Sequence, residues 1–152
     1  MNLRNNERLI ITLISIGCIG LSVESLILGW EYWVPPLLMI GVVSVWGMHI
    51  TGNPEYKLRQ VAYLAYVMLM TFYHGVHETS FLDVALVSVL VLIAFSLFDK
   101  IYMLNLIFAE FWVMFAIQIF LAGGENAIEF DALVISKLIL RVAIVIMVFL
   151  FA

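Results

Sequence analysis

Charged side chains are scarce in this chain: they make up 12% of its 152 residues, whereas apolar residues make up 65%. A globular protein with a water-facing surface carries roughly 25% charged and 45–50% apolar residues. The composition therefore excludes a soluble enzyme and a disordered segment. Cysteine is nearly absent as well, and the one thiol, Cys18, excludes a disulfide scaffold. We expect a single polytopic membrane domain over residues 1–152, with the lipid bilayer as its surroundings.

The sequence also lacks the fingerprints of known reaction chemistry. It contains no P-loop, no dinucleotide-binding glycine motif, no nucleophile elbow and no His-Glu-x-x-His pair. The net charge of −4 and the absence of a long basic run argue against nucleic acid as a partner. We therefore predict no catalytic residue, no metal and no cofactor within these residues.

Long apolar runs fill most of the chain. A helix needs about 20 residues to cross the roughly 30 Å hydrocarbon core of a bilayer. The runs are continuously apolar, whereas the strands of a membrane β-barrel alternate apolar and polar residues. We therefore predict an all-α membrane bundle of six transmembrane helices, at about residues 9–30, 34–50, 58–72, 81–98, 101–121 and 130–152.

The basic residues outside these runs indicate the orientation. Connections rich in Lys and Arg stay in the cytoplasm. Five such residues lie in the N-terminal tail, the second connection and the fourth connection: Arg4, Arg8, Lys57, Arg59 and Lys100. Six crossings place these three segments on one side of the membrane. The sequence therefore predicts that both the N-terminus and the C-terminus lie inside.

Among the ionisable residues within the predicted spans, four stand out: Glu24, Glu110, Lys137 and Arg141. Each costs about 2.5–3.5 kcal/mol at the bilayer centre. Glu110 and Arg141 lie at similar depth in adjacent helices, and Glu24 and Lys137 form a possible second pair. One interpretation is that these charges neutralise each other and fix helix packing. The other is that they line a proton or ion path.

The third connection holds two histidines three residues apart and two carboxylates, as His74, His77, Glu78 and Asp83. Histidine titrates between about pH 5 and 8, so this loop could report external acidity or bind a ligand. A helical turn would also bring the histidines close enough for a metal, although strong further ligands are few. The remaining interpretation is an ordinary interfacial loop. His49 is interpreted as an interfacial histidine.

Two runs suggest a family. The segments FYHGVHETSFLD at residues 72–83 and AFSLFDK at residues 94–100 resemble the N-terminal multi-span membrane region of bacterial sensor histidine kinases and hybrid kinases. The resemblance implies a sensor in the inner (cytoplasmic) membrane for an unknown stimulus. It also implies a homodimer, because the last helix of that family continues into a cytoplasmic dimerisation and phosphotransfer domain.

These observations lead to one expected function and one alternative. We expect a non-catalytic signal-input module that belongs to a longer signalling protein, because the residues to Ala152 include no phosphotransfer or ATP-binding motif. The alternative is a small transporter or channel subunit with Glu110 and Arg141 in its path. A charged helix continuing beyond Ala152 would favour signalling.

Overall fold

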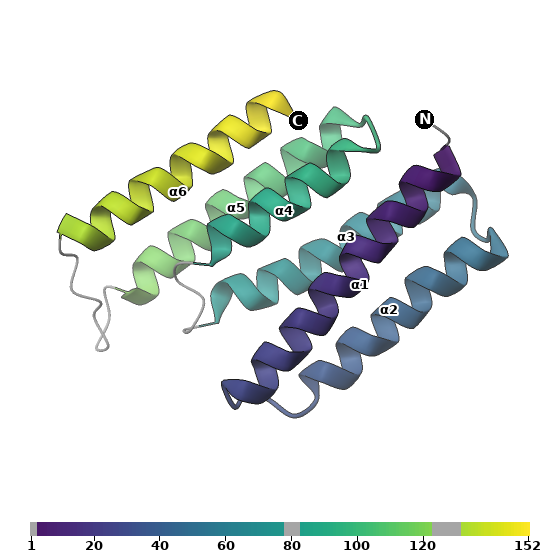
Figure 1. The fold of residues 1–152 in the computed structure, drawn as a ribbon, viewed down its shortest axis with the longest axis horizontal. Coiled ribbons are helices and arrows are strands. Elements are labelled where there is room, and N and C mark those ends of the chain that lie inside the picture. The colour runs from purple at the N-terminus through teal and green to yellow at the C-terminus, as the bar shows by residue number, and fades with distance from the viewer. Residues whose placement is uncertain (1–2, 78–82, 123–131) are drawn as a thin grey trace. The chain divides into compact units, whose positions relative to one another are not determined.

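The computed structural model describes residues 3–77, 83–122 and 132–152, and these residues form six helices without a strand. The predicted all-α class is confirmed. The chain divides into two compact units, Met1–Met70 and Thr71–Ala152. The helices, labelled in Figure 1, are α1 (Leu3–Ile27), α2 (Val34–Thr51), α3 (Tyr56–Val76), α4 (Val84–Ser96), α5 (Ile101–Ala122) and α6 (Ala132–Phe151).

Four of the described helices are long and apolar enough to cross a membrane. They contain the candidate spans Arg4–Ile27, Val34–Thr51, Ile101–Leu121 and Ala132–Phe151. Large apolar side chains on these helices are exposed, such as Phe120 on α5 and Leu150 on α6. Exposed apolar surface on this scale is rare in soluble monomers and marks contact with lipid or a partner. The helices therefore indicate a membrane protein.

Three helices differ most from the predicted spans. α1 begins at Leu3 rather than near residue 9, and α3 continues to Val76 rather than ending near residue 72. α4 has 13 residues, where the sequence predicted a span over 81–98. A helix rises 1.5 Å per residue, so α4 is about 20 Å long and shorter than the hydrocarbon core. α4 ends at Ser96, and Asp99 in the connection that follows has a φ of 54°.

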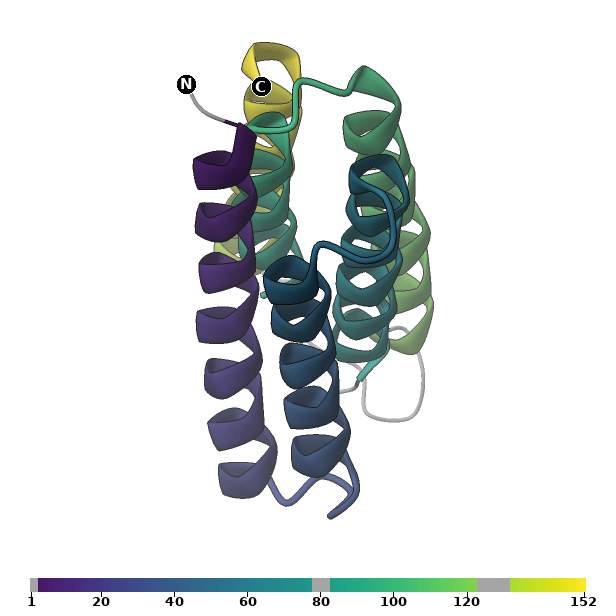
Figure 2. The same ribbon diagram turned by 90° about the vertical axis from the view of Figure 1, so that its right-hand side faces the viewer.

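In the first unit, α1 and α2 lie side by side, as both ribbon views show (Figures 1 and 2). α1 buries Ile10, Ile14 and Cys18, which follow one another at helical spacing, and α2 buries Leu38 and Val45. Proline occupies the first turn of α2, where its missing N–H costs nothing. The two helices therefore form an antiparallel hairpin with a continuous apolar seam.

A glycine ends α2 and determines where α3 begins. Gly52 adopts a left-handed conformation with φ 69°, and its N–H donates to the Met48 carbonyl at 3.0 Å. Glycine adopts this conformation without a steric penalty, which makes it the usual residue after a helix end. In α3, the Tyr66 hydroxyl donates to the Leu38 carbonyl of α2 at 2.8 Å. The middle of α3 is thereby held against the first half of α2.

In the second unit, α4 packs against both α5 and α6 (Figure 1). Leu92 and Phe95 of α4 and Phe111 of α5 are fully buried. The rings of Phe108 on α5 and Phe149 on α6 stack with centroids 4.1 Å apart. Apolar and aromatic packing therefore joins these three helices, and the short connection predicted between α4 and α5 is present.

Candidate functional site

The buried carboxylate of α5 contacts the end of α3. Glu110 is 8% exposed, and the hydroxyl of Thr71 on α3 donates to its Oε1 at 2.9 Å. Thr71 is buried as well. A polar group away from water is costly unless it is hydrogen-bonded, so this contact stabilises Glu110 where it lies. The sequence identified Glu110 as an intramembrane charge and did not identify Thr71 as its partner.

Two turns further along α5, Gln118 holds the last turn of α3. Gln118 is 2% exposed, and its Nε2 donates to the carbonyls of Gly75 and, at 3.0 Å, of His77. The last carbonyls of a helix have no partner within the helix. A side chain from α5 supplies these donors, so the end of α3 is attached to α5.

A glycine makes this close approach of the two helices possible. A Cβ atom added at Gly75 would overlap the side chain of Met114 on α5. Gly75 and Met114 are both buried. Glycine is the residue that lets a neighbouring element approach the backbone closely. The contact between α3 and α5 therefore depends on the absence of a side chain at position 75.

The two histidines lie at the end of α3. The sequence analysis placed both in the third connection, whereas α3 continues to Val76 and takes in His74. His74 is buried, and His77 follows the helix with a half-buried ring 6.3 Å from that of Tyr73. Glu78 lies outside the described residues. A sensing or metal-binding role for these histidines stays a prediction.

The connection after His77 leads to a contact between α4 and α6. Asp83 stands at the N-cap position of α4, and its Oδ1 lies 3.9 Å from Nη1 of Arg141 on α6. Asp83 is half-exposed and Arg141 is half-buried. The carboxylate beside Arg141 is thus Asp83, while Glu110 is bonded to Thr71. The predicted pairing of Glu110 with Arg141 stays a prediction.

The second predicted pair is divided between the two units. Glu24 lies half-buried on α1, in the first unit, and Lys137 is exposed on α6, in the second. Their pairing also stays a prediction. Over residues 3–77, 83–122 and 132–152, no three His, Cys, Asp or Glu side chains come close enough to hold a metal ion.

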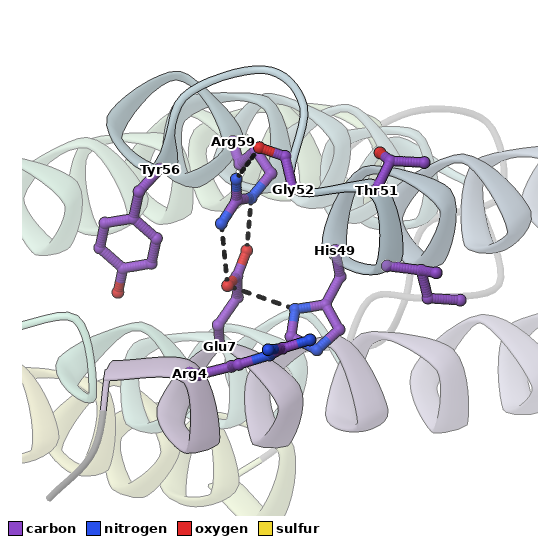
Figure 3. Close-up of a pocket in the computed structure, with 8 residues that line it drawn as sticks. Arg4, Glu7, His49, Thr51, Gly52, Tyr56 and Arg59 are labelled. Atoms are coloured by element: carbon purple, nitrogen blue, oxygen red, sulfur yellow. Dashed lines mark hydrogen bonds and ion pairs between the residues drawn. The ribbon is translucent and has the colours of Figure 1, made fainter.

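The first unit contains a polar cluster that the sequence analysis missed. Glu7 on α1 is 2% exposed, and its carboxylate accepts hydrogen bonds from the Tyr63 hydroxyl at 2.9 Å and from Arg59. Nδ1 of His49 on α2 lies 3.2 Å from Glu7 Oε2. Figure 3 shows the Glu7 carboxylate between Arg59 and His49. We call Glu7, His49, Arg59 and Tyr63 the Glu7 cluster.

Arg59 joins this cluster to the turn between α2 and α3. Its Nε and Nη2 donate to the two oxygens of Glu7 at 2.7 and 3.2 Å. Its Nη1 donates to the carbonyls of Gly52 at 2.6 Å and Pro54 at 2.8 Å. A guanidinium that meets a carboxylate at two points gives both strength and a fixed geometry. One side chain therefore connects α1, α3 and the intervening turn.

The sequence held a weak signal for this cluster. Glu7 shares the helical stripe of Ile10, Ile14 and Cys18, which are all buried. An acid on an otherwise apolar stripe predicts a buried partner. The first predicted span begins at residue 9 and leaves Glu7 outside it, and Arg59 was predicted to be a basic residue of a cytoplasmic connection.

The hydrogen bonds of the Glu7 cluster and those of Glu110 and Gln118 hold helices in position and offer little reaction chemistry. In the Glu7 cluster two hydrogen bonds from Arg59 and one from Tyr63 occupy the carboxylate. In the second unit, Glu110 and Gln118 attach α5 to the end of α3. Both arrangements suit a protein that holds helices in a defined relation. No protein-family model, curated protein or solved structure matches this chain.

Proposed function

We propose that the chain is the membrane-embedded input module of a bacterial signalling protein, non-catalytic in these residues. The observation that carries the proposal is the contact of Asp83 with Arg141, at 3.9 Å. It connects the residue that follows the third connection to α6, the last helix of the chain. The resemblance of residues 72–83 and 94–100 to sensor histidine kinases supports the same proposal, and with it a homodimer in the cytoplasmic membrane.

The proposed topology is six crossings with both ends inside. The Glu7 cluster supports it, because it brings the start of α1, the end of α2 and the start of α3 to one end of the first unit. That end carries Arg4, Arg8, Lys57 and Arg59, as the positive-inside rule requires. α3 has 21 residues and is about 32 Å long, enough to span. The short α4 would cross with local thinning of the bilayer.

The proposed mechanism uses one fixed helix end and one movable contact. Gln118 attaches the end of α3 to α5, so a stimulus that acts on the third connection would displace the start of α4 instead. Asp83 at that start would then strengthen or lose its contact with Arg141. Because an unpaired charge away from water is costly, α6 would shift to keep Arg141 solvated or paired.

Coupling between Asp83 and the far end of α6 tests this mechanism without knowledge of the stimulus. The full chain is reconstituted in liposomes in a Cys18→Ser background with Leu150→Cys, an exposed position near the end of α6. Asp83→Asn should change the rate at which a thiol reagent labels position 150. Asp99→Asn, an exposed carboxylate in the connection after α4, is the matched control and should leave the rate unchanged. Equal rates in all three proteins would contradict the mechanism.

The rival function is a small transporter or channel subunit. The buried Glu110 within the candidate span of α5 favours it, because intramembrane acids often mark proton or ion paths. The same liposomes, loaded with a pH-sensitive dye, distinguish the two functions. An input module should give no proton flux above empty liposomes. Flux that is abolished by Glu110→Gln would replace the signalling proposal with the transport one.

A further inference from the structure

A pocket opens beside the Glu7 cluster. It has a volume of about 500 Å³, and Arg4, Glu7, His49, Ile50, Tyr56 and Arg59 are among the residues that line it. In Figure 3 the side chains of Arg4 and His49 come from α1 and α2, while Arg59 and Tyr56 come from α3. Three helices of the first unit therefore contribute polar side chains to one opening.

The charge around the pocket is positive. Glu7 is neutralised by Arg59, which donates to both of its oxygens. Arg4 adds a further positive charge on an exposed side chain. It lies in the first turn of α1, where backbone N–H groups that have no partner within the helix also attract anions. Near this end, four basic residues outnumber two acidic ones: Arg4, Arg8, Lys57 and Arg59 against Glu7 and Glu55.

One aliphatic side chain, that of Ile50, also lines the pocket. Ile50 lies near the end of α2 and is 72% exposed. α2 is one of the helices long and apolar enough to cross a membrane, so Ile50 lies where lipid meets the helix end. Tyr56 also lines the pocket, and tyrosine is typical of the boundary between hydrocarbon and water. The lining thus combines cationic side chains and one aliphatic side chain.

We propose that this pocket binds an anionic phospholipid, with the headgroup phosphate at Arg4 and His49 and an acyl chain along Ile50. A phosphate accepts hydrogen bonds from a guanidinium and from an imidazole N–H, and Arg59 is held by Glu7 and two carbonyls. Free inorganic phosphate presents the same oxygens but has no apolar part to contact Ile50. The lipid therefore contacts both kinds of side chain, and phosphate only one. The inference does not depend on the proposed signalling function.

Lipid retention by the full chain in detergent tests the proposal. Native mass spectrometry compares bound phosphatidylglycerol with phosphatidylcholine as the two lipids are titrated. The wild type should prefer phosphatidylglycerol, and Arg4→Gln should weaken that binding about fivefold, the effect of losing one basic residue near an anionic headgroup. Arg8→Gln is the matched control, because Arg8 is exposed one turn further along α1 and is not among the pocket residues.

The outcomes separate the site from its alternatives. Equal losses in Arg4→Gln and Arg8→Gln would mean diffuse attraction to a basic surface and would overturn the proposal, as would equal binding of the two lipids by the wild type. Sodium phosphate that displaces the lipid at millimolar concentration would assign the site to a free phosphate instead. Ile50→Asn keeps the Glu7 cluster and should weaken lipid binding. An unchanged affinity would contradict the proposed contact between the acyl chain and Ile50. Circular dichroism of each variant verifies that it is folded.

Discussion

Arg59 and Glu7 form a two-point ion pair across 52 residues of sequence, with Nε 2.7 Å from Oε1 and Nη2 3.2 Å from Oε2. Both side chains are buried. Breaking a buried pair by removing one partner leaves an uncompensated charge and costs about 3–5 kcal/mol, whereas removing both partners costs much less. Each member of the pair is therefore needed to compensate the buried charge of the other.

We accordingly expect Arg59→Met to lower the free energy of unfolding by about 3–5 kcal/mol. The double variant Glu7→Gln with Arg59→Met should recover a large part of that loss. Unfolding of the chain in detergent, followed by circular dichroism, measures the effect. Arg8→Met is the control, because Arg8 is exposed on the same helix as Glu7. Strict additivity of Glu7→Gln and Arg59→Met would contradict direct pairing.

The close approach at Gly75 gives a second prediction. Gly75→Ala places a methyl group against Met114 and should destabilise the chain by about 1–3 kcal/mol, the usual cost of overpacking. Met114→Ala in the same chain should relieve part of this cost. The control is Gly17→Ala in α1, where an added Cβ meets no atom within 4 Å and alanine should stabilise the helix by about 0.5–1 kcal/mol. The same destabilisation at both glycines would contradict the proposed contact.

Double-mutant cycles distinguish the two possible partners of Glu110. The hydrogen bond from Thr71 predicts a coupling energy between Glu110→Gln and Thr71→Val of about 0.6 kcal/mol, the average for such bonds between membrane helices. The sequence instead pairs Glu110 with Arg141, which predicts coupling between Glu110→Gln and Arg141→Met. Unfolding in detergent measures both cycles. Coupling to Arg141 alone would favour the sequence-based pair and contradict the contact with Thr71.

Cysteine labelling tests the proposed topology. In a Cys18→Ser background, a reagent that does not cross membranes should modify Thr79→Cys from outside intact cells and should leave Asn53→Cys unmodified. Asn53 is exposed in the turn after α2, so its side chain can react once the membrane is opened with detergent. The reverse pattern of labelling would place the basic end of the first unit outside. Labelling of both positions from outside would rule out the crossing by α3.

Local start and stop signals determined which helix ends the sequence could predict. α2 and α5 lie within one residue of the predicted runs, because a Pro-Pro pair and Gly52 bound the first and Lys100 precedes the second. The end of α3 was missed, since the apolar run weakens near Tyr73 while Gln118, distant in sequence, supplies hydrogen bonds that extend the helix. Apolar content measures the affinity of a segment for lipid and does not show where its last carbonyls find donors.

The sequence predicted individual residues of the candidate site but not which residues contact one another. The sequence identified Glu110 and Arg141 as costly groups that need partners, and the structure gives them Thr71 and Asp83. Depth along two helices does not determine which faces meet, because that depends on helix rotation. The Glu7 cluster was missed for a related reason: an acid near a chain end is ordinarily solvated, and its burial becomes visible only when α1 and α3 are packed together.

The separation of Glu7 from Arg59 also bears on how the chain is made. The ribosome synthesises Glu7 52 residues before Arg59, so α1 and α2 emerge while the carboxylate still lacks its guanidinium. A bare carboxylate resists entry into hydrocarbon, and water at the membrane surface is its best surroundings until then. The ion pair between α1 and α3 therefore forms only after the start of α3 has left the ribosome.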